Sequence, residues 1–351
     1  MLFVLISLFS FITSVTLPNY RKSHIVVTSG LIAVLLSFVR LPDSLEYQYM
    51  YEQLPNLSIN IILGNSFEFN NLYGEYLFKL FMSLTKTLGL DYQIFTILCL
   101  FIIVSLKLFL FSTLTKKNHL YSLAVLFYFS FLFYQDSYIL RQSLASSLVC
   151  LSIIFLLKDR IKKGLSCWLV SPFIHTSSAI TILIFPIEYI KLTKNSYYIL
   201  LIIFVSIGLA GAGNILNILP NYFPDNYISQ KIAYYANNKY SEELGLLRGS
   251  VILYTTITLL SLTNKDRITH LDYLIKLALT SLFFLISFND FGIFSDRIFR
   301  LFSFVYPVLY AFLLVNIQIK NKRYLYASLI FLSILLSFYS NSSYRYEWID
   351  F

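Results

Sequence analysis

Five arginines lie where apolar segments of the sequence begin or end: Arg40, Arg141, Arg248, Arg297 and Arg300. A guanidinium group is planar and can donate two parallel hydrogen bonds to a phosphate group. A charge at the edge of hydrocarbon is costly and usually has a partner or a function. We therefore predict that these arginines bind a polyanionic ligand such as a pyrophosphate.

The alternative is that each arginine reaches outward to lipid headgroups or pairs with a nearby carboxylate. The carboxylates closest in sequence are Asp43, Asp136, Asp290 and Asp296. Either reading can hold for one arginine, but five such positions together favour a common ligand.

Three further side chains could transfer or orient a proton: His175, Asp43 and Glu75. His175 follows a short apolar segment that contains Pro172, and a polar stretch follows it. Non-helical backbone at membrane depth survives only where protein or a water-filled cavity surrounds it. We predict that His175 faces such a cavity, although a histidine can also be a hydrogen-bonded core residue.

The composition identifies a polytopic membrane protein. The chain has 351 residues, of which 57% are hydrophobic and 13% charged, whereas a soluble domain carries about 25% charged residues. Lipid permits only helices or closed barrels, and no barrel-like alternation occurs, so we predict one all-α membrane domain, 1–351. The net charge of +9 is spread between apolar runs and does not indicate nucleic-acid binding. No Asp-x-Asp motif or metal-ligand cysteine spacing occurs, so we expect no metal and no cofactor.

The apolar runs predict about twelve membrane spans. Loops rich in Lys and Arg tend to lie in the cytoplasm, and this tendency predicts that both termini lie outside. The predicted spans are 1–17, 25–41, 93–114, 119–135, 139–157, 164–175, 177–190, 197–212, 248–262, 270–288, 298–315 and 324–340. Segments 164–175 and 177–190 are short, and we interpret them as a re-entrant-like pair that turns at His175.

Two long segments are predicted to lie outside the membrane. Segment 42–92 contains Tyr47 and an amphipathic helix, Leu72 to Leu88, with Leu77, Leu80, Phe81 and Leu84 at helical spacing. Segment 213–247 contains Tyr234 and Tyr235. Aromatic faces suit sugar rings, so these tyrosines are candidate glycan-binding residues; an aromatic belt at the membrane interface is the alternative.

The order of several short motifs resembles the Wzy-type O-antigen and exopolysaccharide polymerases of the EpsG-like branch. These motifs are Arg40-x-x-Asp43 followed by tyrosines, Glu75, Arg141-Gln142-x-x-Ala145, His175-x-x-Ser178-Ala179, and Arg297 before Phe302. The sequence departs from the family at Pro42-Asp43-Ser44, where a Gly-Thr-Asp-Tyr run is usual. The likeness covers most of the chain.

The resemblance implies a GT-C-like membrane glycosyltransferase in the bacterial cytoplasmic (inner) membrane, with its active site facing the periplasm. Its substrate would be an oligosaccharide repeat unit on undecaprenyl pyrophosphate. The growing glycan would pass to the non-reducing end of the incoming unit, without metal. Because no covalent nucleophile is evident in the sequence, we expect a single displacement with inversion. A chain-length regulator and a flippase are the implied protein partners. We expect Arg141 and Arg297, helped by Arg40, Arg248 and Arg300, to bind the pyrophosphate.

Two other functions remain open at this point. An O-antigen ligase would use the same donor with lipid A core as acceptor. A lipid-linked oligosaccharide flippase would also have about twelve spans, although the sequence contains no internal repeat and its arginines cluster on one predicted face. A membrane acetyltransferase is disfavoured because His175 has no arginine-rich partner set on the inner face.

Overall fold

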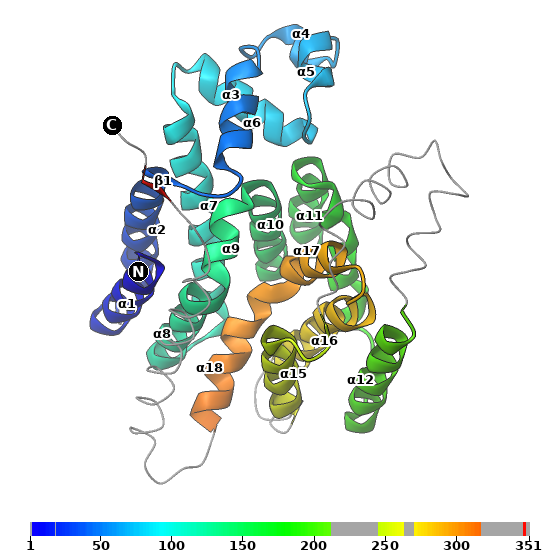
Figure 1. Cartoon of the computed structure of the whole chain (residues 1–351). Helices are drawn as coiled ribbons and strands as arrows, with labels where there is room; N and C mark the ends of the chain where they lie inside the picture. The colour runs from blue at the N-terminus through cyan, green and yellow to red at the C-terminus, as the bar shows by residue number, and fades with distance from the viewer. Residues whose placement is uncertain (1, 18, 212–244, 263–269, 317–346, 349–351) are drawn as a thin grey trace. The chain divides into compact units, whose positions relative to one another are not determined.

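Helices dominate the parts of the chain that the computed structural model describes, residues 2–17, 19–211, 245–262, 270–316 and 347–348 (Figure 1). The chain divides into two compact units. The first consists of 1–179 with 317–351, and the second of 180–316. The all-α prediction is confirmed for the described residues, whose only strands are two residues long.

Long apolar helices form the core of the first unit: α1 (Leu2–Thr16), α2 (Arg21–Ser37), α7 (Tyr92–Leu114), α8 (Asn118–Phe127), α10 (Leu140–Leu156) and α11 (Ile161–Ile174). Helix α7 packs against α2 and α10, α10 packs against α11, and α1 packs against α8. At the α10–α11 crossing, a Cβ on Gly164 would lie 3.1 Å from the carbonyl oxygen of Ser152. Oγ of Ser152 donates to the Gly164 carbonyl at 2.7 Å, so the absence of a side chain at Gly164 sets the close spacing of the two helices.

Segment 42–92 folds into four helices at one end of α7, α10 and α11 (Figure 1). They are α3 (Ser44–Gln53), α4 (Ile59–Ile62), α5 (Phe67–Asn71) and α6 (Tyr76–Thr87). Two lysines of α6 hold them together. Nζ of Lys86 donates to the carbonyls of Glu52 and Leu54 at the end of α3, at 2.7 and 2.6 Å. Nζ of Lys79 donates to the carbonyl of Phe69 in α5, at 2.6 Å. Cations suit the carbonyl end of a helix, and these bonds make the segment an ordered cap.

The amphipathic helix predicted at 72–88, which we expected at the outer membrane-water boundary, exists as α6. Phe78 and Met82 are fully buried, whereas Leu84 is 41% exposed. Leu77, Leu80 and Phe81 are half-buried, so α6 packs inward mainly through Phe78 and Met82.

The predicted span 119–135 is interrupted. Helix α8 continues into a π-helical turn at Tyr128–Leu132 and then into α9 (Phe133–Tyr138). A second break separates α9 from α10, which begins at Leu140. π-helical turns occur frequently at functional sites, and this one lies shortly before Arg141.

The predicted break at His175 is confirmed, but the second leg of the pair is not an α-helix. Helix α11 ends at Ile174, and His175 is extended with φ −153° and ψ 113°. A 3₁₀ helix follows at Thr176–Ile184 and a short one at Pro186–Glu188. Pro172 has no N–H for the carbonyl of Trp168, and Oγ of Ser171 donates to that carbonyl instead, at 2.9 Å.

The second unit is built around α16. Its described helices are α12 (Lys194–Leu209), α15 (Gly249–Leu262), α16 (Leu271–Ser287), α17 (Gly292–Phe302) and α18 (Tyr306–Asn316). Helix α16 packs against α12, α15 and α17. Gly208 of α12 touches α16 so closely that a Cβ there would lie 2.3 Å from the carbonyl oxygen of Ile286.

Two described helical stretches are long and apolar enough to cross a membrane, Tyr92–Leu114 and Phe294–Leu314. Shorter apolar helices occur at Leu2–Thr16, Leu140–Leu156, Thr176–Glu188, Lys194–Leu209 and Gly249–Leu262. These helices agree with a membrane protein, while the count of twelve spans and the GT-C-like architecture stay predictions. The predicted span 324–340 and most of the predicted external segment 213–247 lie outside the described residues.

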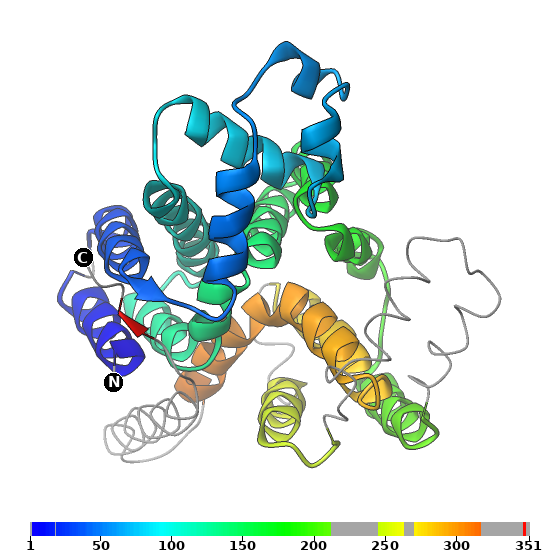
Figure 2. The same ribbon diagram turned by 45° about the horizontal axis from the view of Figure 1, so that its top comes forward.

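One short strand pair joins distant parts of the first unit. Strand β1 (Val39–Arg40) pairs antiparallel with β2 (Glu347–Trp348), with Arg40 opposite Glu347 (Figure 2). In the chain, Arg40 lies shortly after α2 and just before the cap that segment 42–92 forms.

We expect Gly208→Ala to destabilise the second unit because its methyl group would overlap the Ile286 carbonyl. Thermal unfolding of the detergent-solubilised protein should show a lower midpoint, with less monodisperse protein recovered. Gly30→Ala in α2 is the matched control, since nothing lies within 4 Å of a Cβ there. Equal midpoints for the two variants would contradict the close α12–α16 contact.

Candidate functional site

Glu75 is the centre of a polar cluster in the first unit. It directly precedes α6 in extended backbone, with φ −74° and ψ 150°, and its carboxylate does not cap that helix. Instead Oε2 accepts from Nη1 of Arg141 at 3.0 Å, and Oε1 lies 3.3 Å from Nδ1 of His175. Oε1 also accepts from the backbone N–H and the hydroxyl of Thr176, at 3.3 and 3.2 Å. One carboxylate thus connects the starts of α6 and α10 with the end of α11.

Gly74 makes this approach possible. Its φ of +118° lies in the region that favours glycine. A Cβ at this position would lie 3.2 Å from Sδ of Met50 and 3.4 Å from Nη1 of Arg141. The missing side chain therefore lets Glu75 and Arg141 meet.

Arg141 is the second residue of α10, and its guanidinium lies among aromatic rings. Cζ is 4.7 Å from the ring centre of Tyr73 and 5.6 Å from that of Tyr47. The side chain is 12% exposed. Among the described residues, buried Nε has no hydrogen-bond partner. Because a guanidinium carries five N–H donors, Arg141 keeps donors for an anionic ligand after binding Glu75.

The break at His175 is held by a chain of hydroxyl groups. Oγ of Ser178 donates to Oγ of Ser171 at 3.0 Å, and the Ser171 hydroxyl in turn donates to the carbonyl left over by Pro172. The backbone N–H of His175 donates to the Ser171 carbonyl. These bonds fix the backbone at His175. The imidazole lies with Nδ1 3.3 Å from Oε1 of Glu75, so Nε2 is the nitrogen on the far side of the ring.

Electrostatics assign different roles to the members of this cluster. Burial alone would raise the pKa of the Glu75 carboxyl, but His175, Arg141 and the Thr176 N–H hold that pKa well below its usual range. Burial raises the pKa of the Tyr47 phenol to about 12, against the opposing effect of the Arg141 charge. Glu75 is thus an ionised orienting group and a weak base, whereas His175 has the chemistry of a general base held by a carboxylate.

A second charged network supports the start of α10. Lys107 of α7 is buried, and its Nζ lies 2.5 Å from Oδ2 of Asp136. The same carboxylate accepts from the hydroxyls of Tyr128 and Ser143, at 2.9 and 3.0 Å. The network thus ties α7, the π-helical turn and α9 to the first turns of α10, which carry Arg141.

The sequence offered Asp136 as an arginine partner, and in the structure it pairs with Lys107. Sequence reasoning missed Lys107, although it is a lone charge within the predicted span 93–114. A charge inside a membrane segment implies a partner, and that rule could have identified the lysine.

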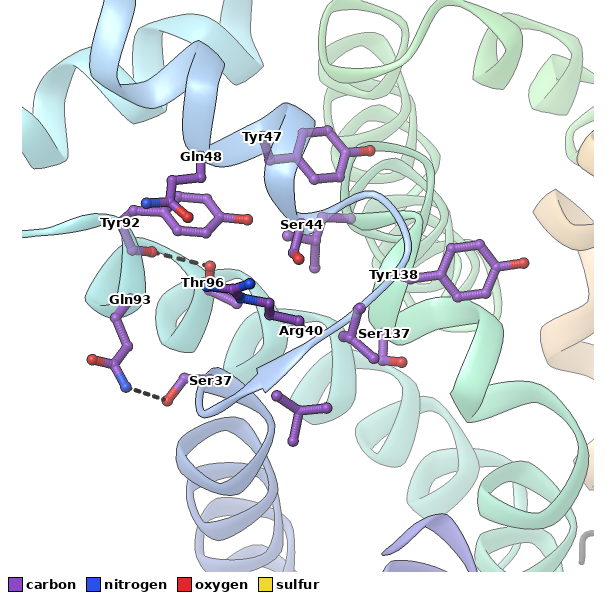
Figure 3. A pocket seen from close by; sticks show the side chains of 13 residues that line it. Ser37, Arg40, Ser44, Tyr47, Gln48, Tyr92, Gln93, Thr96, Ser137 and Tyr138 are labelled. Atoms are coloured by element: carbon purple, nitrogen blue, oxygen red, sulfur yellow. Dashed lines mark hydrogen bonds between the residues drawn. The ribbon is translucent and has the colours of Figure 1, made fainter. Parts of the chain in front are cut away.

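The other predicted site residues of the first unit are Arg40, Asp43 and Tyr47, which lie in β1, directly before α3 and in α3. Arg40 is in β1 and, together with Tyr47, lines a pocket (Figure 3). Asp43 occupies the position before α3 without a side-chain capping bond, and its charge acts on Tyr47. Tyr47 is buried, with its ring on Arg141, so it contacts the cluster that Glu75 organises.

The remaining predicted arginines belong to the second unit. Arg248 precedes α15, and Arg297 and Arg300 are in α17. Arg300 forms an ion pair with Asp296 one turn earlier, with Nε to Oδ2 at 2.7 Å, as the alternative reading of these arginines proposed. Joint binding of one pyrophosphate by Arg141 and Arg297 stays a prediction. Tyr234 and Tyr235 lie outside the described residues.

Within the described residues, no three His, Cys, Asp or Glu side chains gather in a group that could hold a metal ion.

The sequence profile of the EpsG family matches residues 22–350 of the chain. No curated protein and no solved structure gives a significant match. The matched range contains the whole Glu75–Arg141–His175 cluster.

We expect Lys107→Met to be strongly destabilising because it leaves Asp136 buried without its cation. Breaking such a pair costs about 3–5 kcal/mol. The double variant Lys107→Met with Asp136→Asn should recover much of the loss, as measured by unfolding of the purified protein. A double variant as unstable as the single one would contradict the pairing.

The stability that Glu75 contributes should depend on pH. Its folded pKa is depressed, so the contribution is fully present above its unfolded pKa, about 4.3, and declines as pH falls from there toward the folded pKa. The unfolding midpoint of Glu75→Gln should therefore lie furthest below that of the wild type near pH 7, and the gap should narrow below about pH 4.5. A gap that stays constant down to pH 3 would contradict the ion pair.

Proposed function

Because the chain belongs to the EpsG family, we propose that it is a membrane glycosyltransferase that polymerises the repeat units of a polysaccharide. The family fits polysaccharide biosynthesis by a membrane protein. The proposal is finer: the donor is a glycan on undecaprenyl pyrophosphate, the acceptor is an incoming lipid-linked repeat unit, and the reaction takes place at the outer face of the cytoplasmic membrane. A chain-length regulator and a flippase belong to the same proposal as partners.

One observation carries this proposal: the Glu75 carboxylate holds Arg141 and His175 at one place. The cation and the base candidate come from segments far apart in sequence and meet at distances of 3.0 and 3.3 Å from that carboxylate. Transfer from a pyrophosphate carrier needs both a cation for the leaving group and a base for the incoming hydroxyl group.

In the proposed reaction, a hydroxyl oxygen of the acceptor attacks the anomeric carbon of the donor. The bond from that carbon to the pyrophosphate oxygen breaks, and its electron pair stays on the pyrophosphate. Arg141, with Arg297, Arg40, Arg248 and Arg300 as further candidates, stabilises the charge that develops there. Nε2 of His175 accepts the hydroxyl proton, and the ionised Glu75 stabilises the resulting imidazolium. A single displacement of this kind inverts the anomeric configuration and needs no metal.

The guanidinium of Arg141 lies over the rings of Tyr73 and Tyr47. We infer that it binds a ligand that accepts two parallel hydrogen bonds, such as a phosphate group. A lysine would keep the charge but lose the fork and the ring contacts. We therefore expect Arg141→Lys to reduce polymerisation by about 100-fold or more, which is the order found when one donor to a developing oxyanion is removed.

The measurement is a glycan ladder from cells in which the variant replaces the wild type at equal protein level. Arg160→Ala is the matched control, because Arg160 lies exposed at the start of α11 and should leave the ladder intact. A full ladder from Arg141→Lys would defeat the proposed role of the guanidinium.

His175 is tested by its pH profile. With purified protein and lipid-linked repeat units, His175→Gln should abolish the rise of rate with pH that a histidine base produces, and lower the rate by about 100-fold or more. An unchanged pH profile in this variant would remove His175 from the mechanism.

The null phenotype separates the competing functions. A polymerase null leaves a single repeat unit attached to the final acceptor, whereas a ligase null leaves none. A flippase null leaves repeat units on the inner leaflet.

A further inference from the structure

Tyr73 is an aromatic residue of the Glu75–Arg141–His175 cluster to which the proposed reaction gives no contact with substrate. It directly precedes Gly74, whose positive φ turns the chain into Glu75. Its ring centre lies 4.7 Å from Cζ of Arg141. The ring therefore packs on the group that we assign to the leaving pyrophosphate.

Exposure distinguishes Tyr73 from the groups that it touches. The side chains of the cluster are nearly buried, whereas Tyr73 is 59% exposed. A ring covered on both faces could not keep that exposure, so the guanidinium covers one face and leaves the other accessible. Thr176, whose hydroxyl donates to the Glu75 carboxylate, is exposed as well. The cluster therefore lies just beneath the surface of the first unit, and Tyr73 and Thr176 form part of that surface.

Exposure alone would not indicate a ligand, because single exposed apolar residues are common. Tyr49 of α3 is a comparison within the same cap. It is 64% exposed, and no cation lies on its ring among the residues that the structure describes. At Tyr73, in contrast, the accessible ring and the cation are in direct contact, and the ion-paired carboxylate lies next to that cation. An apolar face and a phosphate-binding group thus occur at one place.

A sugar that carries an anomeric phosphate has matching chemistry. In a lipid-linked donor, one oxygen joins the anomeric carbon to the pyrophosphate, so a pyrophosphate bound to Arg141 brings the first sugar ring directly beside the guanidinium. The C–H groups on the face of a sugar ring are apolar and pack against aromatic rings. The guanidinium on the opposite face of Tyr73 offsets part of the negative charge of the ring, so we expect the attraction to come mainly from packing.

We propose that the accessible face of Tyr73 stacks on the sugar ring that is joined directly to the donor pyrophosphate. The ligand class is a sugar with an anomeric phosphate, with its phosphate on Arg141 and its ring on Tyr73. This inference rests on the proposed function for the identity of the donor, whereas the binding of a sugar phosphate by the two residues does not. The competing reading is an aromatic anchor in the membrane interface, and the experiment separates the two.

Binding is measured on the full-length protein in lipid nanodiscs, by titration with saturation-transfer NMR. The probes are glucose 1-phosphate, N-acetylglucosamine 1-phosphate and methyl phosphate, which is a phosphate monoester without a ring. We expect the wild type to bind at least one sugar phosphate more tightly than methyl phosphate. Tyr73→Ala should weaken binding of that sugar phosphate by about 5-fold, the order expected for loss of an aromatic contact. Binding of methyl phosphate should change by less than about two-fold.

Three further variants serve as controls. Tyr73→Phe keeps the ring and should bind every probe as the wild type does. Tyr49→Ala removes an equally exposed tyrosine of the cap and should also leave all probes unaffected. Arg141→Lys loses the guanidinium fork and should weaken binding of all three probes, which locates them at one cation.

Several outcomes overturn the proposal. One is a wild type that binds neither sugar phosphate more tightly than methyl phosphate. Another is sugar-phosphate binding that Tyr73→Ala leaves unchanged, and a lower thermal stability of that variant in nanodiscs then assigns Tyr73 to the membrane interface. A third is an equal loss for sugar phosphate and methyl phosphate, which limits Tyr73 to holding Arg141 in place.

The kinetic arm varies the concentration of the polymer-bearing carrier at a fixed concentration of the single repeat unit. Tyr73→Ala should raise the KM for this donor several-fold and leave kcat nearly unchanged, because the stacking is present before and during bond cleavage. A lowered kcat at constant KM contradicts this. If sugar phosphates bind through Tyr73 but no repeat unit is polymerised, the proposed function fails and the binding site stands. If polymerisation proceeds and Tyr73→Ala leaves the KM unchanged, the function stands and the inference fails.

Discussion

The arrangement of the first unit depends on one buried ion pair, between Glu75 and Arg141. The two side chains are 11% and 12% exposed, so neither charge is well solvated. Such a pair is tolerated only when further hydrogen bonds satisfy its remaining donors and acceptors. Thr176 supplies them to the carboxylate. The ring of Tyr73 covers the guanidinium, whose Nε has no partner among the described residues. The same carboxylate also contacts His175, with Oε1 3.3 Å from Nδ1.

Breaks in regular helices bring the three groups together. An uninterrupted helix through His175 would turn its imidazole to another face, and Pro172 with the following extended residue prevents this. Similarly, the interruption between α9 and α10 allows Arg141 to lie in the first turn of a new helix. The freed backbone groups are recaptured locally, by Ser171 at one break, while Asp136 ties the other break to Lys107. Irregular backbone is thus confined to places where side chains can satisfy it.

The helical cap of segment 42–92 connects this cluster with the pocket that Arg40 lines. Lysines of α6 bind carbonyl groups of α3 and α5 and so join the helices of the cap to one another. Tyr47 projects from α3 and contributes both to the pocket and to the surroundings of Arg141.

The sequence by itself determined the helical class, the apolar segments, the break at His175, and Arg141, His175 and Glu75 as candidates, because these depend on local composition and on the chemistry of single residues. It could not determine which carboxylate pairs with which cation. Glu75 and Arg141 are 66 residues apart, and Glu75 and Thr176 are 101 apart, so their contact follows from how α6, α10 and α11 pack. The pairing of Asp136 with Lys107 and the pocket at Arg40 were likewise decided by tertiary structure, since burial and side-chain direction arise only when distant helices meet.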